Sequence, residues 1–180
     1  MLSTEDSSES QDSLTDGAAL EFCSPSFAGV LHDNLSNKHR QGSGFNPLIL
    51  KSYSGANLYR DDAVGINFEH IFNGAKEQSE ISMFTPRQDP CHLKQVGESR
   101  YEIYWPSEGS KWRMMARMVY DFSAKNQIDL SFECMPKVDL YSQGFAAMMW
   151  ASYMNCALDR KIHFWGTECD RTGWVAFGED

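Results

Sequence analysis

The sequence predicts an all-β protein, an antiparallel β-sandwich, from three observations. Apolar and polar residues alternate over residues 112–122 and again over 128–134, with a polar turn between them. Alternation with a period of two is typical of a strand with one buried face, and a short polar turn joins antiparallel neighbours. Further apolar or alternating segments recur at short intervals. Many short strands with turns between them indicate a sandwich or a barrel.

The N-terminal segment predicts a tail that precedes the folded region. Residues 1–16 contain five acidic side chains, five serines and no basic side chain. A segment of this composition cannot bury enough apolar surface to offset the entropy lost on ordering. We therefore expect residues 1–18 to form a disordered acidic tail and residues 19–180 to form a single β-sandwich domain.

Each predicted strand is bounded by turn or loop residues. Asn73-Gly74 is a strong turn dipeptide, and the prolines of segment 85–90 must end any strand that reaches them. The apolar run 144–154 predicts a strand buried on both faces, with a short helix as the alternative. In chain order the predicted strands are Leu20–Phe22, Phe27–Leu31, Leu48–Leu50, Gly65–Phe72, Ile81–Phe84, Tyr101–Trp105, the central hairpin of 112–122 and 128–134, Gly144–Met154 and Ile162–Trp165.

Composition excludes several classes of function. The net charge of -9 argues against general binding of nucleic acid or of anionic membranes, because both need clustered Lys and Arg. No apolar run approaches the ~20 residues of a membrane helix, and the acidic N-terminus does not match a signal peptide. The five cysteines are odd in number and contain no CxxC pair. We expect a reduced, cytoplasmic protein with no bound metal and no cofactor.

Five segments together resemble a known group of proteins. They are Gly65–Asn73, Ile128–Pro136, Gly144-Phe145, Trp150–Asn155 and Asp159–Phe164. In these segments the chain resembles uncharacterised bacterial proteins of the galactose-mutarotase-like β-supersandwich fold. That fold includes sugar epimerases and domains of glycoside hydrolases and lyases, so the resemblance implies carbohydrate as the ligand class. Fold alone does not define an activity.

The length of the chain departs from this pattern. A supersandwich domain normally needs more residues than follow the predicted tail, and the epimerases take their general base from a glutamate late in the fold. Segment 174–180 looks like the entry to another strand. We therefore expect either an incomplete supersandwich or one that completes its sheets as a homodimer.

His70 and Glu69 are the candidate catalytic residues. Epimerases of this type open a sugar ring with a general acid and a general base, commonly His and Glu. His70 shares its parity with Phe68 and Phe72, so a core histidine is the alternative role. Glu69 shares the other face with Asn67, where it would meet either a ligand or solvent.

The remaining candidates would bind a ligand. Arg117 and Glu133 share the polar face of the central hairpin, where they form either a ligand-binding row or a cross-strand salt-bridge ladder. His163 and Trp165 offer a hydrogen-bonding edge and a ring to a sugar, or pack against another sheet. The full set of predicted ligand-binding residues is Asn67, Arg117, Glu133, Tyr153, Asn155, His163 and Trp165.

Three functions follow from these residues. The first is a carbohydrate-binding domain without a catalytic pair. The second is a sugar-active enzyme, epimerase-like or a partial glycoside hydrolase or lyase, with His70 or His163 as acid and Glu69 or Glu133 as base. The third is a structural or dimerisation domain without a ligand. A histidine facing a carboxylate across a sugar-sized cleft favours the enzyme, and a histidine buried beneath the sheet favours the binding domain.

Overall fold

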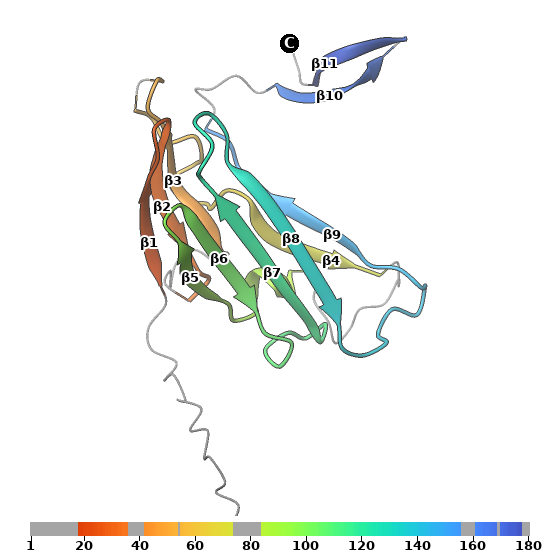
Figure 1. The fold of residues 1–180 in the computed structure, drawn as a ribbon. Helices are drawn as coiled ribbons and strands as arrows, with labels where there is room; N and C mark the ends of the chain where they lie inside the picture. The colour runs from red at the N-terminus through yellow and green to blue at the C-terminus, as the bar shows by residue number, and fades with distance from the viewer. Residues whose placement is uncertain are drawn as a thin grey trace, which may run out of the picture.

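The computed structural model describes residues 18–35, 42–53, 55–73, 84–155, 161–168 and 170–177. In these ranges the chain forms strands and one short helix, as the alternating pattern predicts (Figure 1). Residues 1–17 of the predicted tail lie outside the described residues. The elements are β1 (Ala19–Cys23), β2 (Phe27–His32), β3 (Gly44–Leu50), β4 (Asn67–Phe72), α1 (Thr85–Gln88), β5 (His92–Gly97), β6 (Arg100–Trp105), β7 (Met114–Asp121), β8 (Asp129–Pro136), β9 (Ala147–Ala151), β10 (Ile162–Glu168) and β11 (Arg171–Phe177).

The strands form antiparallel sheets that stack in two layers. One layer is the four-stranded sheet β5-β6-β7-β8, and the other contains the sheets β1-β2-β3 and β4-β9. A bridge between Phe45 and Gly65 connects β3 to the segment that enters β4. A Cβ atom at Gly65 would collide with the ring of Tyr59, so this close approach requires glycine. Figure 1 shows β7 and β8 in front of β4 and β9.

Aromatic side chains fill the space between the layers. The Phe68 ring of β4 lies 5.4 Å from the Trp105 ring of β6 and 5.2 Å from the Phe132 ring of β8. At the other end of the core, Phe22 of β1 stacks on Phe122 with the ring centroids 4.2 Å apart. Such contacts bury large apolar surfaces from both sheets, which confirms the predicted sandwich-like arrangement.

The central hairpin is β7 and β8. Met118 pairs with Phe132 and Ala116 with Cys134, and the residues of β7 on this face are buried in the core. The first strand begins at Met114 and not at Trp112, because Arg113 has a positive φ of 49° that interrupts the extended backbone. The alternation therefore predicts the buried face correctly and misplaces only the start of the strand.

Two strand predictions need correction or completion. The run 144–154 is wrong as a strand buried on both faces, because β9 is short and most of its side chains are exposed. Among the described residues β9 pairs only with β4, so its other edge has no neighbouring strand to cover it. In the predicted strand Ile81–Phe84, residues 81–83 lie outside the described part of the chain and Phe84 belongs to the turn before α1.

The last two strands form a separate hairpin. β10 and β11 pair with each other and, in the described part of the chain, with no other strand. Trp165 and Trp174 face each other across this pair with ring centroids 5.7 Å apart, in an edge-to-face arrangement. Their residues are 65% and 70% exposed. None of the helices described here is long and apolar enough to cross a membrane.

Candidate functional site

A β-bulge in β4 decides where the predicted catalytic residues lie. Phe68 pairs with Trp150, but the next pair is His70 with Met149, so β4 has one extra residue at Glu69. The extra residue reverses the alternation, and both Phe68 and Ile71 belong to the hydrophobic core. His70 therefore lies on the side of β4 away from the core, where α1 packs against the strand.

The bulge brings Asn67, Glu69 and His70 to Arg87 of α1, and we call these four residues the β4 cluster. Glu69 is 2% exposed. Its Oε1 atom lies 3.5 Å from Arg87 Nη1 and 3.4 Å from His70 Nε2. Asn67 Nδ2 donates a hydrogen bond of 3.2 Å to Glu69 Oε2. A buried carboxylate needs such partners, because burial without them costs several kcal/mol.

Local sequence explains why α1 covers this side of the strand. Pro86 occupies the first turn of α1, where its missing N–H is no loss. Thr85 and Pro86 are buried, and the Asp89 N–H donates a 2.6 Å hydrogen bond to the Thr85 carbonyl that closes the short helix. The ring of Phe84, just before α1, lies 4.3 Å from the His70 ring. Arg87 is thereby directed at Glu69.

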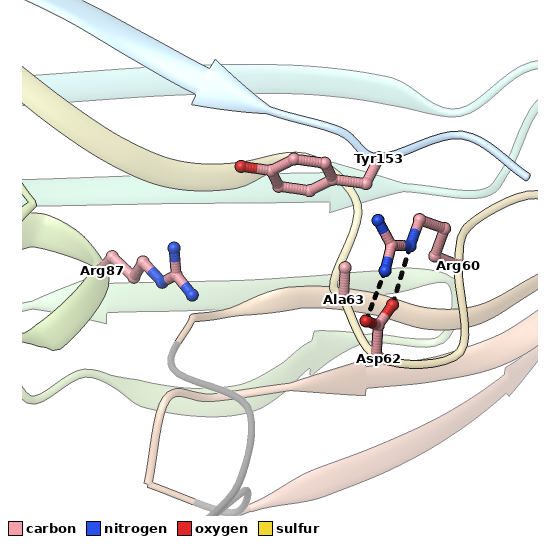
Figure 2. Close-up of a pocket in the computed structure, with 5 residues that line it drawn as sticks. All are labelled: Arg60, Asp62, Ala63, Arg87 and Tyr153. Carbon is pink, nitrogen blue, oxygen red and sulfur yellow. Dashed lines mark hydrogen bonds and ion pairs between the residues drawn. The ribbon is translucent and has the colours of Figure 1, made fainter.

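An open pocket of about 160 Å³ lies beside the β4 cluster (Figure 2). Arg60, Asp62, Ala63, Arg87 and Tyr153 line it. Arg60 donates to both Asp62 oxygens, from Nε at 2.9 Å and from Nη2 at 2.6 Å. Figure 2 shows the guanidinium groups of Arg60 and Arg87 on opposite sides of the pocket with the Tyr153 ring beside them. Arg87 therefore belongs to both the pocket and the β4 cluster.

Long-range hydrogen bonds hold the pocket walls in place. The buried amide of Asn46 in β3 donates to the backbone carbonyls of Arg60 and Asp61, both at 3.3 Å. The Arg60 N–H donates to the Tyr153 carbonyl at 2.9 Å. Asn155 Nδ2 donates to the Asn57 carbonyl at 3.3 Å, so this predicted ligand-binding residue anchors the chain that leaves β9. The last two bonds join residues 93 and 98 positions apart in the sequence.

Arg117 and Glu133 lie elsewhere, in a cross-strand network that we call the sheet ladder, with Lys94 and Glu102. Lys94 Nζ lies 2.9 Å from Glu102 Oε1, and Arg117 Nε lies 2.5 Å from Glu102 Oε2. Arg117 Nη1 also lies 3.7 Å from Glu133 Oε2. Burial raises the pKa of the Glu102 carboxyl, but Lys94 and Arg117 together bring that pKa below its ordinary value. The geometry is that of a salt-bridge ladder.

The other predicted residues divide between these places. His163 and Trp165 are exposed on the β10–β11 hairpin and do not line the described pocket. Sequence reasoning found Tyr153 but missed Arg60, Asp62 and Arg87. Arg60 and Asp62 lie in a turn, and Arg87 lies in the proline-bounded segment that predicted only the end of a strand. No signal in the sequence connects these three residues with Tyr153.

Neither a metal site nor a known relative identifies the pocket. In the described ranges no group of three or more His, Cys, Asp and Glu residues is placed to hold a metal ion. Comparison of the chain with models of protein families, with curated protein sequences and with solved structures found no match. Any function must therefore be argued from the geometry of the pocket.

Proposed function

We propose that this protein binds carbohydrate, with the Tyr153 pocket as the site. The observation that supports the proposal is an exposed aromatic ring beside two guanidinium groups and a carboxylate in one pocket. An aromatic face packs against the apolar face of a sugar ring, and planar charged groups exchange hydrogen bonds with its hydroxyl groups.

The size of the pocket restricts the ligand. Its volume is about 160 Å³. A cavity of ~150 Å³ is known to hold a benzene ring, so this volume fits one six-membered ring. The pocket is below the range of roughly 300–1,000 Å³ typical of sites for larger ligands. We therefore propose that it takes a single pyranose unit, either a monosaccharide or one residue of a longer chain.

The surroundings of His70 and Glu69 favour binding over acid–base catalysis. These side chains lie only 3.4 Å apart, both are buried, and neither lines the described pocket. A general acid and a general base must each reach the substrate. In this arrangement Glu69 supports Arg87, and His70 packs between the rings of Phe72 and Phe84.

Isothermal titration with a panel of neutral monosaccharides and disaccharides tests the proposal. We expect a dissociation constant of about 1 mM for the best sugar, since a ligand of this size gains only about 4 kcal/mol. Tyr153→Ala should weaken binding by about tenfold or more, because the aromatic platform is lost.

Tyr53→Ala is the matched control, because Tyr53 is 47% exposed and Tyr153 is 46% exposed, and Tyr53 does not line the pocket. Absence of binding to every sugar of the panel would overturn the proposal, as would an equal loss in both variants. Analytical ultracentrifugation of the same samples tests the alternative of a homodimer.

A further inference from the structure

Each cation that lines the Tyr153 pocket has a carboxylate beside it. Arg60 Nη2 lies 2.6 Å from Asp62 Oδ2, and Arg87 Nη1 lies 3.5 Å from Glu69 Oε1. These four side chains carry two positive and two negative charges, so together they supply no net charge to a ligand. The chain as a whole carries a net charge of -9. A negatively charged ligand therefore gains little from entering the pocket.

The two carboxylates are not equivalent. The Asp62 side chain is 68% exposed, so water and salt screen its charge. The Glu69 side chain is 2% exposed and lies behind Arg87. Its charge is screened much less, because fewer water dipoles and ions surround it. Glu69 thus has the stronger influence on an anion that approaches Arg87 from the pocket.

We infer that Glu69 determines specificity in this pocket, making it select neutral sugars over acidic sugars such as uronic acids. This inference rests on the proposed carbohydrate-binding function. Glu69 acts through Arg87 and is a positioning residue. Its carboxylate orients the guanidinium and offsets its charge, so Arg87 serves as a hydrogen-bond donor to sugar hydroxyls and not as a receptor for a carboxylate.

The test compares glucose with glucuronic acid, or the corresponding pair for whichever neutral sugar binds best, by titration at pH 7. On the unmodified protein we expect the neutral sugar to bind about tenfold more tightly than its uronic acid. Glu69→Gln retains the length of the side chain and an oxygen that can accept from Asn67 Nδ2, and it removes the negative charge. This variant should bind the uronic acid about tenfold more tightly than the parent does, with a much smaller change for the neutral sugar.

Asp62→Asn removes the exposed carboxylate and is the comparison variant. The ratio of its affinities for the neutral sugar and the uronic acid should differ from that of the parent by about twofold or less, because the charge of Asp62 is screened. If Glu69 has only a structural role, Glu69→Gln will weaken the binding of both sugars equally, and that outcome overturns the inference. Tighter binding of the uronic acid to the unmodified protein also overturns it, and this measurement remains decisive if Glu69→Gln does not fold. Binding of neither sugar to the unmodified protein would instead overturn the proposed function.

Discussion

The β4 cluster and the sheet ladder use the same types of side chain in different surroundings. Each contains a buried glutamate paired with an arginine, Glu69 with Arg87 and Glu102 with Arg117. The ladder extends over strands of one sheet and ends at Glu133, whose side chain is 70% exposed. The cluster lies beneath α1 and adjoins a pocket. The residue types are the same in both. The β4 cluster adjoins a candidate binding site because α1 and a turn pack beside it, whereas the sheet ladder only links neighbouring strands.

Removal of Glu69 should give the largest loss of stability. Glu69→Ala leaves the buried amide of Asn67 and the guanidinium of Arg87 without this acceptor. We expect the free energy of unfolding to fall by about 2–3 kcal/mol, because the buried Asn67 amide loses an acceptor and Arg87, 31% exposed, loses this buried counter-charge. Urea denaturation monitored by circular dichroism measures this change. A loss below about 1 kcal/mol would show that the cluster is no more tightly coupled than a surface pair.

Removal of the Glu102 charge should have an intermediate effect. Glu102→Gln weakens the bonds to Lys94 and Arg117, and we expect a loss of about 1.5 kcal/mol at pH 7, limited because both cations remain partly in water. Because its pKa is lowered in the folded protein, the Glu102 carboxylate contributes stability above its ordinary titration range, and this contribution is lost as the pH falls. The difference between parent and variant should therefore shrink on acidification.

Glu133→Gln is the control for this prediction. The Arg117–Glu133 contact is longer, at 3.7 Å, and Glu133 is exposed, so we expect a change of about 0.3 kcal/mol or less at any pH. If the two variants lose the same stability, the ladder does not depend on the burial of Glu102.

Neutralisation of Asp89 should have a smaller effect than the changes at Glu69 and Glu102, and one of opposite sign. Burial raises the pKa of this residue at the end of α1 to about 6, although hydrogen bonds from Ser110 and the Lys111 backbone oppose the shift. Because the pKa of Asp89 is raised, its protonated form stabilises the folded protein. This contribution is fully present below the ordinary carboxyl pKa of ~4, and it is lost as the pH rises through about 6.

Asp89→Asn removes this ionisation, so it should stabilise the protein by about 0.5–1 kcal/mol above pH ~7 and leave it unchanged near pH ~4. The gain is limited because Ser110 and the Lys111 backbone donate hydrogen bonds to the charged carboxylate. Thermal unfolding of parent and variant across this pH range provides the measurement. Parallel pH profiles would show that Asp89 titrates normally in the folded chain.

Alternation predicted the fold because it depends only on neighbouring residues. Met114, Ala116 and Met118 of β7 enter the core as the period of two requires. The same rule fails in β4, because the bulge arises from pairing with β9, a strand about eighty residues later. His70 therefore has the opposite orientation to the one that its parity predicts. A one-residue change in register reverses the face of every side chain that follows.

The candidate site was less predictable than the fold. Asn67, Glu69 and His70 are sequence neighbours, so a motif in one strand suffices to suggest them. Arg60, Arg87 and Tyr153 come from a turn, a short helix and the exit of β9. Asn46 holds the Arg60 turn against β3, and Asn155 holds the exit of β9 against Asn57, so Arg60 and Tyr153 come together. Exposed polar residues in turns carry no periodicity, so local patterns could not assemble this pocket.

The distribution of tryptophans makes the protein its own optical probe. Trp105 and Trp112 are 2% and 1% exposed, whereas Trp165 and Trp174 of the terminal hairpin are 65% and 70% exposed. A soluble quencher such as acrylamide reaches the second pair at once and the first pair only after the sandwich opens. Trp150 of β9 is 36% exposed and would also be quenched, so the experiment uses a Trp150→Phe background. In that background, emission at short wavelength follows the core and quenchable emission follows the hairpin, so one denaturation experiment reports whether the two unfold together.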